Sequence, residues 1–160
     1  MCLIYSCALF EVRGLFVLSN FTKADNTYFY YLCSKAIDAG KTGSSIYKRK
    51  KEINKILDQL IEKGVNPQKI FLTGFSAGGW TSLMMMDELE KKFNSAIVFA
   101  PAFAGPRSEI KKYPRWRKIE RPRQVKEMIE AKIIKALIFA YEDDAFNRPQ
   151  ELNFLTLHKT

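Results

Sequence analysis

Ser76 is the residue whose surroundings point most directly to chemistry. It lies in Gly74-Phe-Ser-Ala-Gly-Gly79, after an apolar run at 69–73 and before a helical pattern at 77–92. In a strand–turn–helix context, Gly-x-Ser-x-Gly puts the serine on a sharp turn, with its hydroxyl above the sheet and free to attack. Small residues are required on either side because strand and helix nearly touch there. The pattern therefore predicts a nucleophilic serine.

Alternating apolar runs and amphipathic segments predict the elements that position this serine. We expect strands within 1–10, 14–18, 69–73, 95–100 and 133–140, and helices at 26–39, 52–63, 77–92, 123–132 and 150–157. Continuous apolar strands separated by helices are typical of parallel sheets buried on both faces. The sequence thus predicts an α/β protein with a mostly parallel sheet and helices on both faces.

The stretch around Ser76 resembles the nucleophile elbow of the α/β-hydrolase superfamily, in particular of small serine esterases and dienelactone-hydrolase-like proteins. Ser at this position, in place of Asp or Cys, differs from dehalogenases and from dienelactone hydrolases proper. A chain of 160 residues is short for this superfamily, so the resemblance implies a minimal or truncated form of the fold.

The resemblance also implies partners for Ser76. The acid follows a late strand as Gly-x-x-Asp, which places Asp144 in this role, with Tyr141 at the Gly position and Asp143 as the alternative acid. The base would be His158, the single histidine, and the order Ser–Asp–His is that of the superfamily.

Two features depart from the superfamily pattern. His158 comes soon after Asp144, without the strand expected between acid and base, so a histidine beyond residue 160 is the alternative base. For the oxyanion hole, the resemblance implies the N–H of Ala77 and one from Asn20 or Phe21. Ser19-Asn20 stands where a His-Gly pair is common.

Size and composition fit one globular domain spanning residues 1–160, with 47% apolar residues. Three cysteines give neither a disulfide framework nor a metal-ligand spacing, which favours a reducing compartment, and we expect a cytoplasmic protein without metal. No apolar stretch reaches the length of a membrane span, so no membrane association is expected. The oligomeric state is not determined by the sequence.

The net charge of +9 is concentrated in a basic excursion at about 105–122, where aromatic residues are interleaved. Such a segment is either a solvated excursion above the sheet or a surface for anionic ligands or nucleic acid. We expect the former, and we do not expect nucleic acid as a partner. Gly40-Lys-Thr42 is not a phosphate loop, because residue 35 is Lys and a predicted helix leads into it.

These observations predict a serine hydrolase that acts on a small-molecule carboxylic ester or amide through an acyl-enzyme at Ser76, without a cofactor. The alternative is a catalytically impaired binding protein that keeps the hydrolase scaffold and uses the basic surface.

Overall fold

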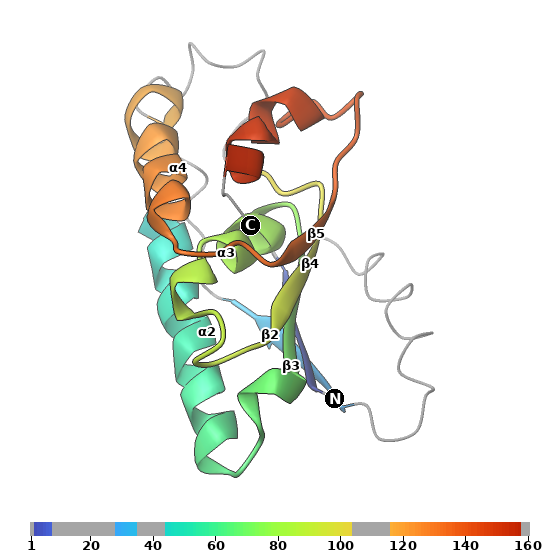
Figure 1. The fold of residues 1–160 in the computed structure, drawn as a ribbon. Coiled ribbons are helices and arrows are strands. Elements are labelled where there is room, and N and C mark those ends of the chain that lie inside the picture. Colours follow the sequence, from blue (N-terminus) through green and yellow to red (C-terminus); the bar gives the residue numbers. More distant parts are fainter. Residues whose placement is uncertain (1, 8–27, 35–43, 104–115, 158–160) are drawn as a thin grey trace.

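The computed structural model describes residues 2–7, 28–34, 44–103 and 116–157. Five strands form one sheet in the order β2-β1-β3-β4-β5 (Figure 1). The strands are β1 (Cys2–Cys7), β2 (Tyr28–Cys33), β3 (Ile70–Phe75), β4 (Ser95–Phe99) and β5 (Ala136–Phe139). Each neighbouring pair is parallel. The predicted α/β class with a parallel sheet is therefore confirmed.

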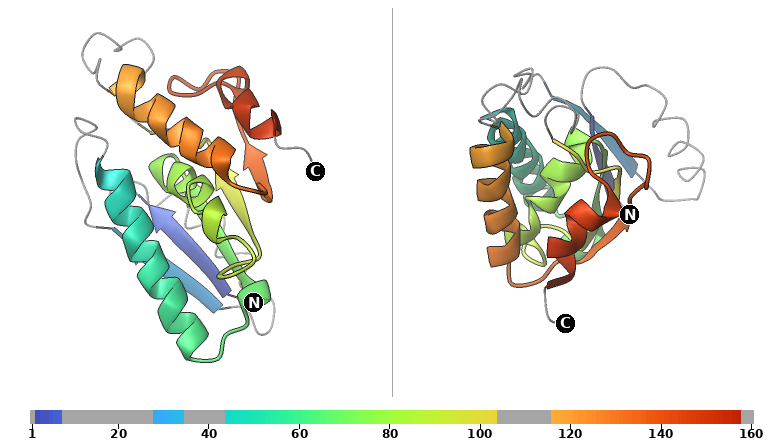
Figure 2. Two further views of the ribbon diagram at one scale, coloured as in Figure 1. Left: turned by 60° about the vertical axis from the view of Figure 1, so that its left-hand side comes forward. Right: turned by 90° about the horizontal axis from the view of Figure 1, so that it is seen from above.

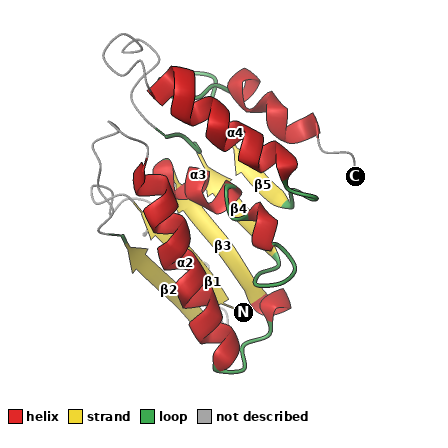
Figure 3. Ribbon diagram, turned by 90° about the vertical axis from the view of Figure 1, so that its left-hand side faces the viewer, coloured by secondary structure: helices red, strands yellow, loops and turns green. Residues whose placement is uncertain are grey.

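In the described part of the chain, three helices connect the strands from β2 to β5 and lie together on one face of the sheet (Figure 3). They are α2 (Ser44–Glu62), α3 (Ala77–Leu83) and α4 (Arg121–Glu130). From β2 onward, each crossover advances the sheet in the same direction, and right-handed crossovers then place their helices on the same face. The connection from β1 to β2, which runs the opposite way, lies outside the described residues, as does the strand predicted at 14–18.

Shorter helical segments complete the described fold. They are the 3₁₀ helices η1 (Pro67–Lys69), η2 (Met86–Glu88) and η5 (Pro149–Leu157), and the π-helical turn η4 (Trp116–Glu120), which runs directly into α4. Helix η5 lies beside α4 (Figure 2). The helix predicted at 150–157 is thus present in a tighter form.

The core lies between the sheet and the helical layer. Trp80 and Leu83 of α3 and Leu57 of α2 are completely buried, together with Leu72 of β3 and Val98 of β4. The apolar face of α2 packs into this core, as its periodicity predicts. The helix begins at Ser44, however, and not at residue 52. It ends before Gly64, which has a φ of +85°, a backbone conformation that favours glycine.

The helix predicted at 26–39 is wrong, because residues Tyr28–Cys33 form strand β2. Aromatic residues fit a pleated strand well, and six apolar residues in a row satisfy a strand as readily as a helix. Pairing with β1, in which Cys2 is opposite Tyr28 and Cys7 opposite Cys33, decides between the two. Tertiary pairing therefore overrides the apparent helical period.

No helix within the described ranges has the length and apolar character needed to cross a membrane.

Candidate active site

The site begins with the backbone of Ser76, at the junction between β3 and α3. Its φ of 50° and ψ of −120° lie in a region that non-glycine residues rarely adopt. Three backbone hydrogen bonds hold it there: the Ser76 N–H donates to the Phe99 carbonyl at 3.0 Å, and its carbonyl accepts from Trp80 at 2.9 Å and Ala102 at 3.2 Å. These bonds offset a conformational cost of about 1–3 kcal/mol.

The hydroxyl of Ser76 is not used to cap α3. A serine at this position of a helix normally accepts a hydrogen bond from an N–H of the first turn, but the Ser76 side chain makes no such bond. The left-handed backbone accounts for this, because the usual cap requires an extended conformation. The hydroxyl is therefore not committed to helix α3.

Glycines allow strand and helix to approach this closely. A Cβ on Gly74 would lie 2.4 Å from the carbonyl carbon of Gly78, and one on Gly79 would lie 3.0 Å from the Gly74 carbonyl oxygen. Both contacts are with backbone atoms, which cannot rotate away. The turn predicted around Ser76 thus requires the glycine spacing that the sequence shows.

Three neighbouring strands end at this edge of the sheet. In register, Phe75 of β3 lies opposite Phe99 of β4, which lies opposite Phe139 of β5. The Phe99 and Phe139 rings stack with centroids 4.8 Å apart. The residue after β4, Ala100, has a φ of 42° and turns the chain into a buried loop at 101–103. Ligands of open parallel sheets bind at this edge, outside the carboxyl ends of the strands.

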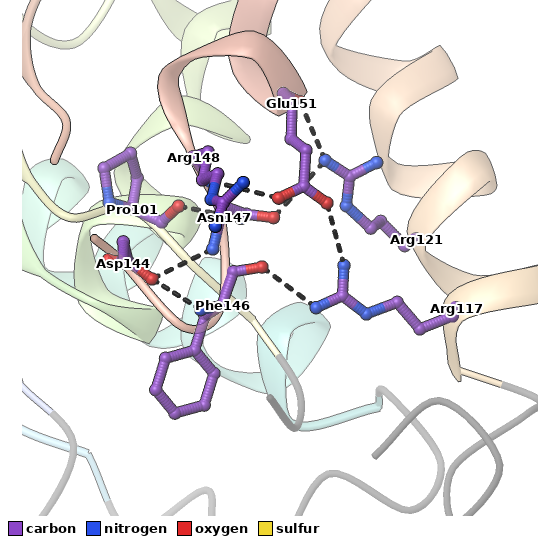
Figure 4. A network of polar contacts seen from close by, with 8 residues as sticks. All are labelled: Pro101, Arg117, Arg121, Asp144, Phe146, Asn147, Arg148 and Glu151. Carbon is purple, nitrogen blue, oxygen red and sulfur yellow. Dashed lines mark hydrogen bonds and ion pairs between the residues drawn. The ribbon is translucent and has the colours of Figure 1, made fainter. Parts of the chain in front are cut away.

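Asp144 lies in the loop that follows β5, and a hydrogen bond connects this loop to Pro101, in the loop after β4 (Figure 4). Its Oδ1 accepts from the N–H of Phe146 at 2.6 Å and of Asn147 at 3.0 Å. Asn147 is 3% exposed, and its Nδ2 donates to the Pro101 carbonyl at 2.9 Å. Ala102, which follows Pro101 in the chain, donates its N–H to the Ser76 carbonyl. The structure therefore brings Ser76 and Asp144 to one edge of the sheet.

The remaining predicted site residues divide into two groups. Ala77 is the first residue of α3, where N–H groups have no acceptor within the helix, and Asp143 is exposed beside the half-buried Asp144. Asn20, Phe21 and His158 lie outside the described residues. Within the described ranges, no three His, Cys, Asp or Glu side chains gather where they could hold a metal ion.

Part of the basic excursion contacts the Asp144 loop, while residues 105–115 are not described. The Arg117 guanidinium donates to the Phe146 carbonyl, and that of Arg121 donates to the Glu151 carbonyl. Burial lowers the pKa of the Arg121 guanidinium from its ordinary value, and the Glu151 carboxylate opposes this shift. Sequence patterns did not predict that Arg117 and Arg121 bind the Asp144 loop. The only signal was their spacing of four residues, which places two side chains on one helix face.

Comparison with known proteins agrees with the class that fold and turn define. By structure, the chain resembles Arabidopsis thaliana SOBER1, with a TM-score of 0.56 and 16% identity over 97% of this chain and 95% of that one. It also resembles esterase PE8, with a TM-score of 0.54 and 14% identity over 97% and 89%. At such identities the likeness establishes the fold alone, and the fold is that of the α/β-hydrolase superfamily.

Residues 23–116, more than half of the chain, match the phospholipase/carboxylesterase family. The chain belongs to this family and is a carboxylesterase/lipase-like hydrolase. A search of curated proteins found no match.

The packing around the turn predicts that Gly74→Ala is strongly destabilising. The new methyl group would overlap the Gly78 backbone, and we expect the free energy of unfolding to fall by about 3 kcal/mol or more. Gly64→Ala is the matched control, since it has a positive φ but open space, and should cost about 1–2 kcal/mol. Urea unfolding measures both. Equal losses would contradict the close approach of strand and helix.

The buried amide of Asn147 predicts a second stability effect. Asn147→Ala leaves the Pro101 carbonyl without its donor, and should lower the free energy of unfolding by about 1–3 kcal/mol. Asn153→Ala changes an exposed asparagine in η5, the 3₁₀ helix that follows this loop, and should cost less than about 0.5 kcal/mol. Urea unfolding of the pair tests the connection, which is wrong if Asn147→Ala is as mild as its control.

Proposed function

We propose that this protein is a serine esterase that hydrolyses a small-molecule carboxylic ester or amide through an acyl-enzyme on Ser76. The observation that carries the proposal is the left-handed backbone at Ser76 between β3 and α3, with a hydroxyl that does not cap the helix. Such a turn is strained and needs glycines to form, and strain of this kind gathers at functional positions. We interpret it as a nucleophile elbow.

In this mechanism the Ser76 Oγ attacks the acyl carbon while a histidine takes its proton, and the same histidine then protonates the leaving group. Water hydrolyses the acyl-enzyme in the second half of the reaction. We assign the base to His158. The oxyanion would be held by the Ala77 N–H at the start of α3 and by an N–H from Asn20 or Phe21. A cytoplasmic location and the absence of a cofactor stay predictions.

Asp144 is the proposed acid of the triad, and Asp143 is the alternative. Two observations favour Asp144: it is half-buried, and its loop is tied through Asn147 and Pro101 to the segment that binds the Ser76 carbonyl. Asp143 is exposed. A carboxylate that orients a histidine must be held in a fixed position, and the contacts of Asp144 with two backbone N–H groups provide this.

Ser76→Ala should abolish hydrolysis of a nitrophenyl ester, with a loss of about 10⁴-fold or more in kcat, because the members of a triad act as a unit. A fluorophosphonate probe should label the wild-type protein at Ser76, as read by mass spectrometry of the peptide. Ser95→Ala, at the opposite end of β4, is the matched control and should keep full activity. Full activity of Ser76→Ala would refute the proposal.

Asp144→Asn should lower kcat on the order of 10³- to 10⁴-fold. The amide oxygen can still accept from Phe146 and Asn147, so the loop is retained while the negative charge is lost. Asp143→Asn should stay within a few-fold of wild type, and His158→Gln should lose activity as Asp144→Asn does. Steady-state kinetics on the same ester decide the assignment, and the reverse order of the two Asp variants would transfer the acid role to Asp143.

A further inference from the structure

Two arginines, one helical turn apart, bind the loop that carries Asp144 (Figure 4). Arg117 belongs to η4 and Arg121 begins α4. The Arg117 Nη2 donates to the Phe146 carbonyl at 2.9 Å, and its Nη1 lies 3.4 Å from Glu151 Oε1. The Arg117 side chain is only 11% exposed. Its charge is therefore directed into the protein.

Arg121 connects the same loop to the helix that follows Ser76. Its Nη2 donates to the Glu151 carbonyl at 2.8 Å and lies 3.4 Å from Asn147 Oδ1. Its guanidinium carbon lies 5.5 Å from the ring centroid of Trp80, a buried residue of α3. A guanidinium over an indole face is an attractive contact, and it is stronger where water is excluded.

The hydrogen bond from Arg117 to the Phe146 carbonyl, at 2.9 Å, is shorter than its contact with the Glu151 carboxylate, at 3.4 Å. Arg121 likewise donates to a backbone carbonyl, that of Glu151, at 2.8 Å. Charge-assisted hydrogen bonds of this length are among the stronger ones in proteins. The Glu151 carboxylate also accepts from the Arg148 N–H at 3.0 Å, which closes the start of η5. The loop from Asp144 to Glu151 is thus held at its backbone from the side of α4.

Such support matters because the chain between β5 and η5 has no regular secondary structure. A catalytic carboxylate must be held within roughly 0.5 Å of its working position, and loops hold side chains less accurately than helices or strands do. Helix α4 provides a rigid element next to this loop, and the two arginines make the connection.

We propose that Arg117 and Arg121 are positioning residues for Asp144: they fix the loop backbone at Phe146 and Glu151 and thereby aim the carboxylate at the base. The proposal rests on the esterase function proposed above. It gives part of the basic excursion a structural task inside the active site. Within the described residues, the Phe146 carbonyl and Glu151 accept hydrogen bonds from these two guanidinium groups.

The first test compares kinetics. Arg117→Met keeps the length of the side chain but removes both donors, and should lower kcat for the nitrophenyl ester roughly 10- to 100-fold with little change in KM. Arg117→Lys, which restores one donor, should recover part of the loss. Lys118→Met removes the same charge from the exposed neighbouring residue and should leave kcat within about twofold of wild type. Equal kcat values for the two Met variants would overturn the proposal.

A double-mutant cycle separates positioning of Asp144 from a general effect on the fold. If Arg117 acts through the Asp144 carboxylate, Arg117→Met should cause almost no further loss of kcat in the Asp144→Asn background. A full additional loss there would overturn the inference while leaving the esterase function intact. Full activity of Asp144→Asn or Ser76→Ala would instead refute the proposed function, and these variants report that independently of Arg117.

A third measurement does not depend on catalysis. The N–H groups of Phe146 and Asn147, which donate to Asp144, should exchange with solvent faster in Arg117→Met than in Lys118→Met, as followed by NMR. Unchanged exchange would contradict the proposal. Should Arg117→Met fail to fold by circular dichroism, Glu151→Gln takes its place, because it removes the charge facing Arg117 and keeps an acceptor for Arg148. Its kcat should fall below that of Lys118→Met, and equal kcat values for these two variants would overturn the proposal.

Discussion

The close approach of β3 and α3 is the constraint on which the rest of the site depends. It is possible only because Gly74 and Gly79 place no side chain between the two backbones. At this junction Ser76 has a left-handed conformation, and this conformation prevents the serine from capping its own helix. The two glycines therefore allow a turn in which the Ser76 hydroxyl does not cap α3 and lies at the carboxyl edge of a parallel sheet.

The second level of organisation is the set of contacts that joins the ends of different strands. The loop after β4 binds the Ser76 carbonyl through Ala102 and the Asn147 amide through Pro101. The loop after β5 contains Asp144 and is held from the other side by α4. Ser76 and Asp144, which are far apart in the sequence, are thus connected through hydrogen bonds to backbone groups. Backbone groups move less readily than side chains.

Sequence patterns predicted the strands and helices that surround Ser76, because long apolar runs and a Gly-rich turn are strong local signals. They did not predict β2, because the apolar residues Tyr28–Cys33 fit the period of a helix and of a strand, and pairing with β1 decides between the two. Nor did they predict the contacts of Arg117 and Arg121 with the Asp144 loop. The sequence of a charged segment does not indicate which of its side chains will be buried. The meeting of Arg117 with Phe146 depends on how α4 packs beside η5, which is a tertiary property.

The two left-handed residues at neighbouring strand ends, Ser76 and Ala100, have a consequence for how the protein folds. Neither conformation is favoured locally, so a peptide spanning only the turn would relax to an ordinary one. The bonds that hold Ser76 come from Phe99 and Ala102, which reach it only after β4 has paired with β3. Closing that loop costs chain entropy before the contacts form. The site is therefore complete only once β4 has paired with β3, and a local opening of β4 would remove two of the three bonds that hold Ser76.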